Sequence, residues 1–186
     1  TANNTTYQGF GEYIQHQQGT GGSHIIAKGY LNNTPKDKFD KRILKNMAAN
    51  IDGDFVGELN PVNFIDYWIK RYNKSYVIAN SKPSLYDTLY QTVCSEEGVP
   101  VEIIKTFGQI ESGNKGLTDI ATRHRGIMQI SNEIAGDYGL SNTDVKDSIT
   151  MACRLYKQYN KDNPFSFLAT QVNNSQQYRE ERVKTK

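Results

Sequence analysis

The strongest constraint on how this chain can fold is a series of short apolar patterns with helical spacing, several of which are ended by glycine. In residues 9–18 apolar side chains recur at intervals of three and four, and Gly19 ends the pattern. Similar patterns predict helices over residues 23–31, 38–49, 61–73, 84–97, 100–112, 131–135, 142–156 and 165–178. Local signals mark some of their ends: Asn60 before Pro61, Ser84 with Asp87, and Ser131 predict helix starts, and Gly98 predicts a stop. The sequence therefore predicts a mainly helical domain of about seven to nine helices, with little strand.

Length and composition narrow the class of protein. The 186 residues suffice for one domain with its own core, and 12 Tyr and 7 Phe indicate a globular chain despite its polar composition. The net charge of +2, without a dense Lys/Arg stripe, argues against nucleic acid as a partner. No apolar run approaches the roughly 18 residues of a membrane span, and no signal peptide is visible.

The sequence predicts neither a metal nor a cofactor. Residues 50–59 have turn chemistry and predict a loop or a small hairpin. Asp52 and Asp54 in this segment suggest calcium ligands, but the spacing and terminal glutamate of an EF-hand are missing. Cys94 and Cys153 lie in apolar helical patterns, so we expect buried thiols rather than a disulfide framework or a metal site.

Glu111 is the residue best suited to carry chemistry. It lies at the C-terminal end of the apolar helical pattern that begins at Pro100, and Gly113 follows almost at once. A carboxylate at the end of an apolar helix is partly desolvated, and desolvation raises a carboxyl pKa toward neutrality. A general acid that protonates a glycosidic oxygen near neutral pH requires such a carboxyl group.

Two short motifs around this residue carry a resemblance. Glu111 and Ser112 end one helix, and the segment Gly126-Ile127-Met128-Gln129 begins 15 positions after Glu111. This combination resembles the lysozyme-like soluble lytic transglycosylases, which have a Glu-Ser pair followed by a Gly-Leu-Met-Gln segment. The resemblance implies a helical fold of the goose-type lysozyme and lytic transglycosylase kind.

The resemblance also implies an activity. It predicts cleavage of the β-1,4 bond between N-acetylmuramic acid and N-acetylglucosamine in peptidoglycan glycan strands, with Glu111 as acid and then base. Ser112 would bond near the carboxyl group or the sugar, and Met128 and Gln129 would line the floor of the groove. Such an enzyme would act on the bacterial cell wall, as an extracytoplasmic or phage virion-associated protein, beside other phage tail or secretion-machine proteins.

A second catalytic carboxylate is not evident. Asp119 and Glu133 are the nearest candidates, and both are interpreted as surface charges. The missing partner favours a transglycosylase over a hydrolytic muramidase. A peptidoglycan endopeptidase on the same fold and a non-catalytic phage tail or structural module remain alternatives.

Another family motif is out of place in the chain. Members of the family have a Tyr-Asn-x-Gly-like element after the Gly-Leu-Met-Gln segment, and residues 12–22 resemble it. His16 would then replace the usual tyrosine and Gln17 the usual asparagine, both near the substrate. One hypothesis is a circularly permuted domain; the alternative is a lysozyme domain without this motif, joined to an unrelated N-terminal segment.

The permutation hypothesis divides the single domain of residues 1–186 into four parts. Residues 7–73 would supply the C-terminal half of the family, and residues 85–162 the N-terminal half with Glu111. Residues 74–84 would form the linker between the old termini, and residues 163–186 a C-terminal extension.

Overall fold

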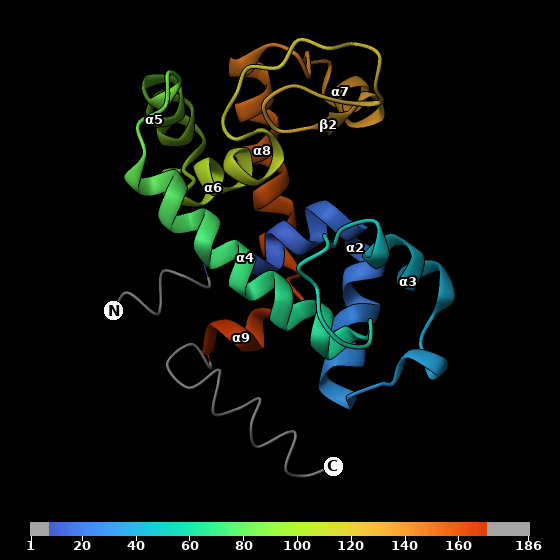
Figure 1. Ribbon diagram of the computed structural model, residues 1–186. Helices are drawn as coiled ribbons and strands as arrows, with labels where there is room; N and C mark the ends of the chain where they lie inside the picture. The colour runs from blue at the N-terminus through green and yellow to red at the C-terminus, as the bar shows by residue number, and fades with distance from the viewer. Residues whose placement is uncertain (1–7, 171–186) are drawn as a thin grey trace. The chain divides into compact units, whose positions relative to one another are not determined.

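The structure, a computed structural model, describes residues 8–170 and is mainly helical over this range (Figure 1). The predicted helical class is therefore confirmed. In chain order the elements are α2 Phe10–Asn32, the 3-10 helix η1 Lys36–Lys38, α3 Lys41–Ala48, α4 Pro61–Ser81, α5 Asp87–Glu97, α6 Val101–Ser112, β1 His124–Arg125, β2 Ile130–Ser131, α7 Asn132–Tyr138, α8 Val145–Lys161 and α9 Ser166–Thr170.

The described residues form two compact units. The first contains the residues up to Arg71 together with those from Asp162 onward, and the second contains Tyr72–Lys161. The boundary thus falls within α4. Each unit has its own buried core, and no helix within residues 8–170 is both long enough and apolar enough to cross a membrane.

The first unit is built around α2 and the start of α4. The two helices predicted over residues 9–18 and 23–31 are both present, and they join at Gly19, whose φ of 77° breaks the helical backbone. Pro61 and Phe39 pack so closely on Gly29 that a Cβ at this glycine would overlap both side chains. Glycine at this position therefore allows α2 to approach the first turn of α4.

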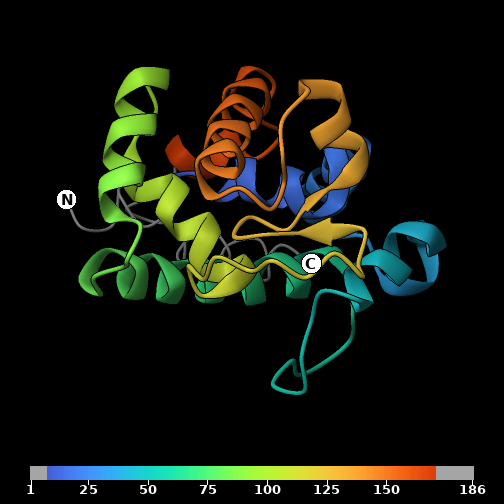
Figure 2. The same cartoon turned by 90° about the horizontal axis from the view of Figure 1, so that it is seen from above.

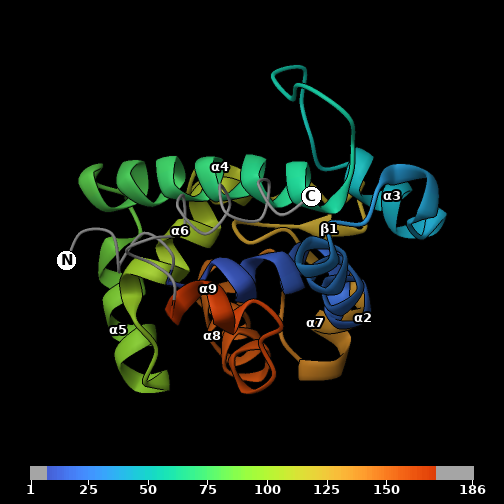
Figure 3. The same ribbon diagram turned by 90° about the horizontal axis from the view of Figure 1, so that it is seen from below.

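A loop of residues 50–60 joins α3 to α4, and it contains neither the hairpin that was one alternative nor a helix. Figures 2 and 3 show it, in teal, extending away from these two helices. The cap that was predicted at the start of α4 is present, because the Asn60 side chain accepts a hydrogen bond of 2.9 Å from the Asn63 N–H. Pro61 is the first residue of the helix, as expected.

The predicted end of this helix is wrong. The sequence predicted an end near residue 73 and a linker over residues 74–84, but α4 continues to Ser81. Residues 74–82 contain no glycine or proline that would stop a helix, and Pro83 is the first residue to do so. Polar side chains near the end bond back to the helix, as when Ser81 Oγ donates to the Val77 carbonyl at 2.6 Å.

In the second unit α5, α6 and α8 pack against one another. Cys94 on α5 and Cys153 on α8 are buried free thiols, as predicted, and their sulfur atoms are 3.7 Å apart. At the end of α5 the half-buried Glu97 carboxylate pairs with Arg154 and Lys157 of α8, each at 3.2 Å. The two helices are therefore joined by an apolar contact and by an ionic one.

The remaining elements of this unit are short. β1 and β2 form an antiparallel pair in which His124 lies opposite Ser131, and no pattern in the sequence predicted it. Ser131 caps α7 as expected, because its Oγ accepts from the Ile134 N–H at 3.2 Å. α8 begins at Val145, slightly later than predicted, because the Asp144 carboxylate caps it by accepting from the Asp147 N–H. The predicted helix over residues 165–178 begins as α9, and residues 171–178 lie outside the described range.

Candidate functional site

The candidate site centres on Glu111, in the last turn of α6. Apolar side chains on one side of this helix are buried in the second unit (Ile103, Ile104, Phe107). The helix ends because Gly113 adopts a left-handed conformation with φ of 67°, which glycine accepts without strain. Glu111 itself is half-buried as a residue, and the desolvation of its carboxyl group stays a prediction.

Ser112 connects the two motifs that carry the family resemblance. Its Oγ lies 2.7 Å from the Ile127 carbonyl and donates a hydrogen bond to it, and it also accepts from the Lys115 N–H at 3.1 Å. The end of α6 and the segment 126–129 are separate in the sequence, yet this side chain holds them in contact. The serine thus has a structural role, because it joins the helix that carries Glu111 to the turn of residues 126–129.

The segment 126–129 is a tight turn between β1 and β2. Ile127 and Met128 are almost fully buried, so the Met128 side chain packs in the core rather than facing solvent. Gln129 has a positive φ of 49°, and its side-chain amide donates to the Gly126 carbonyl at 2.9 Å. Of the two residues expected to line a groove, only Gln129 is half-exposed and has an amide oxygen to offer a sugar.

Gly126 is required by the geometry of this turn. Its φ is 77°, and a Cβ added to it would overlap the main-chain carbonyl oxygen of Asn142. Asn142 is itself buried: its side chain donates to the Ile130 carbonyl at 2.9 Å, and its carbonyl accepts from Ser148 Oγ at 2.8 Å. The turn is therefore fixed against the start of α8. From the sequence Asn142 was expected only to start a helix.

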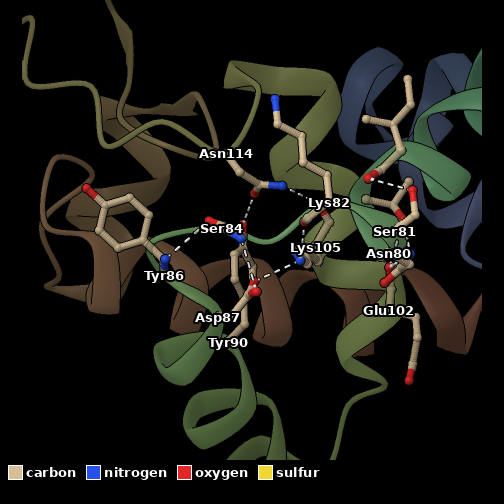
Figure 4. A network of polar contacts seen from close by, with 12 residues as sticks. Asn80, Ser81, Lys82, Ser84, Tyr86, Asp87, Tyr90, Glu102, Lys105 and Asn114 are labelled. Carbon is tan, nitrogen blue, oxygen red and sulfur yellow. Dashed lines mark hydrogen bonds and ion pairs between the residues drawn. The ribbon is translucent and has the colours of Figure 1, made fainter.

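A buried polar clamp, formed by the side chains of Tyr90 and Asn114, holds the C-terminal half of α6 (Figure 4). Asn114 is 8% exposed, and its amide donates to the Lys105 carbonyl at 3.1 Å while its oxygen accepts from the Tyr90 hydroxyl. A Cβ at Gly108 would overlap both of these polar groups. Because burial raises the pKa of Tyr90 well above its ordinary value, the hydroxyl stays protonated and remains a donor.

An ion pair extends this network toward the end of α4. The Lys105 ammonium lies 2.8 Å from an oxygen of Asp87 and donates to the Lys82 carbonyl at 3.0 Å, as Figure 4 shows. Asp87 also accepts from the Ser84 N–H at 3.0 Å, the start signal that the sequence indicated for α5. Burial alone would raise the pKa of Asp87, but the bonds from Lys105 and Ser84 outweigh it and hold the pKa below its ordinary value.

The two candidates for a second carboxylate are surface charges, as interpreted from the sequence. Asp119 is exposed and its side chain caps the turn at Ala121, where it accepts from the backbone N–H at 2.9 Å. Glu133 is exposed and pairs with Arg123 at 2.9 Å, and the hydrogen bond from this arginine lowers the pKa of the glutamate. Each of the two carboxylates has a local structural partner.

His16 and Gln17 belong to the first unit, where both are half-buried on α2. The centroids of the His16 and Tyr13 rings are 6.2 Å apart, and the Gln17 side chain accepts a hydrogen bond from the Gln18 side-chain amide at 2.9 Å. Their roles near a substrate, and the permuted order behind those roles, stay predictions. No role was predicted for Glu12, which is 4% exposed and accepts a hydrogen bond from the Asn163 side-chain amide at 2.8 Å.

Comparisons with family models, with curated proteins and with solved structures find no match for this chain. Within residues 8–170 no three His, Cys, Asp or Glu side chains are grouped so as to hold a metal ion. The functional argument therefore depends on the geometry around Glu111 and on the two motifs joined by Ser112.

Proposed function

We propose that the protein is a peptidoglycan lytic transglycosylase that cleaves the bond between N-acetylmuramic acid and N-acetylglucosamine. The observation that carries the proposal is the 2.7 Å hydrogen bond from Ser112 to the Ile127 carbonyl. It joins the two motifs of the resemblance beside Glu111, a half-buried residue at a helix end. Chance matches in the sequence have no reason to meet in this way.

Glu111 performs both proton transfers in this proposal. In its protonated form it donates to the glycosidic oxygen, so that the bond from the muramoyl C1 to that oxygen breaks and a new hydroxyl leaves on N-acetylglucosamine. The resulting carboxylate then takes the proton from the muramoyl C6 hydroxyl, whose oxygen bonds to C1. The product is a 1,6-anhydro ring, and Glu111 is protonated again.

Two features support a single carboxylate. Asp119 and Glu133 are exposed and engaged in a turn and in an ion pair, so neither is kept in reserve as a nucleophile or base. An enzyme of the two-carboxylate kind needs its second group about 5–10 Å from the first, on the opposite side of the sugar. The substrate's own N-acetyl group and C6 hydroxyl can replace that second group in a transglycosylase.

The place of action that fits this chemistry is the bacterial cell wall, as part of a phage particle or outside the cytoplasm. The permutation hypothesis predicts that His16 lies near the substrate, and this prediction can be tested. His16→Ala should lower turnover at least about tenfold if the ring bonds near the catalytic carboxyl. His24→Ala on the same helix is the control, because His24 pairs with Asp162 at 3.2 Å. Equal activity of the two variants would contradict the permutation.

The direct test of the proposed function replaces Glu111 by glutamine. Glu111→Gln should reduce the clearing of purified cell walls by about 100- to 10,000-fold, the range for loss of a general acid. Glu102→Gln is the matched control, since Glu102 is an exposed glutamate in the first turn of the same helix. Retained activity in the Glu111 variant would contradict the assignment. Release of free amino groups would instead identify an endopeptidase, and wall binding without turnover a structural module.

A further inference from the structure

The first unit contains a pocket that the proposed chemistry does not use. It has a volume of about 340 Å³ and lies between the loop of residues 50–60 and the first half of α4. This volume is at the small end of the range for ligand pockets, about 300–1,000 Å³. The residues that line it include Phe55, Val56, Asn63, Asp66, Tyr67 and Lys70.

The Tyr67 hydroxyl fixes the wall of this pocket. It donates to the Asp54 carboxylate at 2.7 Å and accepts from the Asp52 N–H at 3.1 Å and from the Arg71 guanidinium at 2.8 Å. Arg71 also pairs with the Asp52 carboxylate at 2.7 Å. One hydroxyl and one guanidinium on successive turns of α4 therefore hold an irregular loop in place.

The loop has further attachments to the same helix. The Asn63 amide donates to the Glu58 carbonyl at 2.8 Å, and the Trp68 indole N–H donates to the Asn50 carbonyl at 2.9 Å. A loop without regular structure that is bound at both ends and in its middle forms a largely pre-organised surface. Pre-organisation of this kind reduces the entropy that a ligand would otherwise have to remove.

The pinned loop presents apolar side chains to solvent. Val56 is 86% exposed, and the half-buried Phe55 ring lies edge-on to the Tyr67 ring with centroids 5.3 Å apart. Phe55 and Val56 both line the pocket, so they give it an apolar side that a ligand can contact. Aromatic rings and aliphatic groups of this sort match the apolar face of a sugar ring.

The charges of the pocket balance. Asp54 and Asp66 contribute two negative charges, and Lys70 and Arg71 two positive ones. Arg71 is also paired with Asp52 and lies over the rings of Tyr67 and Trp68, at 5.4 and 4.9 Å from their centroids. A polyanion or a polycation finds no excess of opposite charge here. The lining suits a neutral ligand with many hydroxyl or amide groups and one apolar face.

We propose that this pocket binds a neutral saccharide segment, separately from the residues that perform the cleavage. In the context of the proposed function, on which the identity of the natural ligand rests, the segment is an N-acetylhexosamine unit of a peptidoglycan strand. Phe55 and Val56 contact the apolar face of the ring. Asn63, Asp66 and Lys70 supply hydrogen-bonding groups to its hydroxyl and N-acetyl substituents.

The chain contains a built-in reporter for this site. Trp68 is the single tryptophan, and it contacts both Tyr67, at 6.1 Å between centroids, and Arg71. Its indole N–H gives one well-separated signal in a nitrogen–proton correlation spectrum. Binding in the pocket should shift this signal and the backbone amides of residues 54–71.

The experiment titrates the full chain carrying Glu111→Gln, so that no cleavage occurs, with the β-1,4-linked trisaccharide of N-acetylglucosamine. We expect shifts at Trp68 and across residues 54–71. Adding Phe55→Ala should weaken this binding about tenfold, as for loss of a central aromatic contact. Val56→Glu, which puts a charge at the exposed mouth, should weaken it too. Val77→Glu is the matched control, because Val77 is a 59% exposed valine of α4 outside the pocket.

Three results would overturn the proposal: no shifts anywhere, shifts confined to residues 109–131, or equal affinity of the Val56 and Val77 variants. The proposed function is measured separately, as release of anhydro products by the chain with Glu111 intact. Trp68 shifts without anhydro products would leave the saccharide pocket standing and refute the transglycosylase. Anhydro products without Trp68 shifts would do the reverse.

Discussion

The turn of residues 126–129 and the loop of residues 50–60 are both irregular segments beside a helix, but they are held in opposite ways. The turn receives one side-chain bond, from Ser112, but it depends mainly on main-chain contacts so close that Gly126 has no room for a Cβ against the Asn142 carbonyl. The loop depends on side chains of α4, above all on the Tyr67 hydroxyl. A substitution that adds an atom to a segment fixed by main-chain packing should therefore be strongly destabilising. A substitution in side chains that hold a loop should cost only the hydrogen bonds that it removes.

Gly126→Ala should have the largest effect. The positive φ costs an alanine about 1–2 kcal/mol, and overlap with the Asn142 carbonyl adds about 1–3 kcal/mol. We expect the free energy of unfolding, measured with urea, to fall by about 2–5 kcal/mol. Gly136→Ala is the control, since a Cβ at this helical glycine meets no atom of residues 8–170 within 4 Å. If both variants unfold at the same urea concentration, the close contact is not what fixes the turn.

Tyr90→Phe tests the polar clamp on α6. Removal of the hydroxyl leaves the buried Asn114 oxygen without its donor, which should cost about 1–3 kcal/mol of unfolding free energy. A double-mutant cycle with Asn114→Ala isolates the interaction. Strict additivity of the two single changes would show that the clamp does not act as a unit.

The Asp87–Lys105 pair should make stability depend on pH. Because the pKa of Asp87 in the folded protein lies below its ordinary value of 3.8, its contribution is complete above pH 3.8 and is lost as the pH falls through the lowered pKa. Asp87→Asn should remove about 1–2 kcal/mol at pH 7, since Lys105 is largely buried and loses its partner. It should also flatten the acid limb of the stability profile.

Glu133→Gln is the control for this pair. Its carboxylate bonds Arg123 at the surface, so its loss should leave the urea midpoint at pH 7 unchanged. An unchanged acid limb in the Asp87 variant would contradict the account of the network in Figure 4.

Tyr67→Phe should have the smallest effect on stability. The loop is partly exposed, so water can replace the hydrogen bonds of the lost hydroxyl, and the expected cost is about 1 kcal/mol or less. Amide hydrogen exchange in this variant separates the loop from the turn. Amides of residues 50–60 should exchange faster while those of residues 126–131 stay unchanged. A cost as large as that of Gly126→Ala would mean that the loop is part of the core.

Local features of the sequence predicted the ends of most helices. Asn60 with Pro61, Ser131 and the glycines at 98 and 113 act within a few residues of the helix ends that they fix, so their effect can be read without the fold. The helix α4 was predicted to end near residue 73, yet the sequence has no glycine or proline that would stop it before Pro83.

The site was predictable only in part for the same reason. Glu111, Ser112 and the segment 126–129 stand in the same order as the motifs that they resemble, and the structure brings Ser112 and the segment 126–129 into contact. The Tyr90–Asn114 bond joins residues 24 positions apart, and Asn142 reaches Ile130 across 12. Contacts at such separations leave no periodic trace in the sequence. The loop pocket was missed because its residues have turn and helix patterns that indicate nothing about a cavity.

The central claim is that Glu111 alone drives formation of an anhydro product, and mass spectrometry of digested, purified peptidoglycan tests it most directly. We expect the unaltered chain to release muropeptides with 1,6-anhydro ends, 18 Da lighter than hydrolysis products since no water is added, and Glu111→Gln to release almost none. Reducing ends from the unaltered chain, or anhydro ends that persist in the Glu111→Gln variant, would contradict the account.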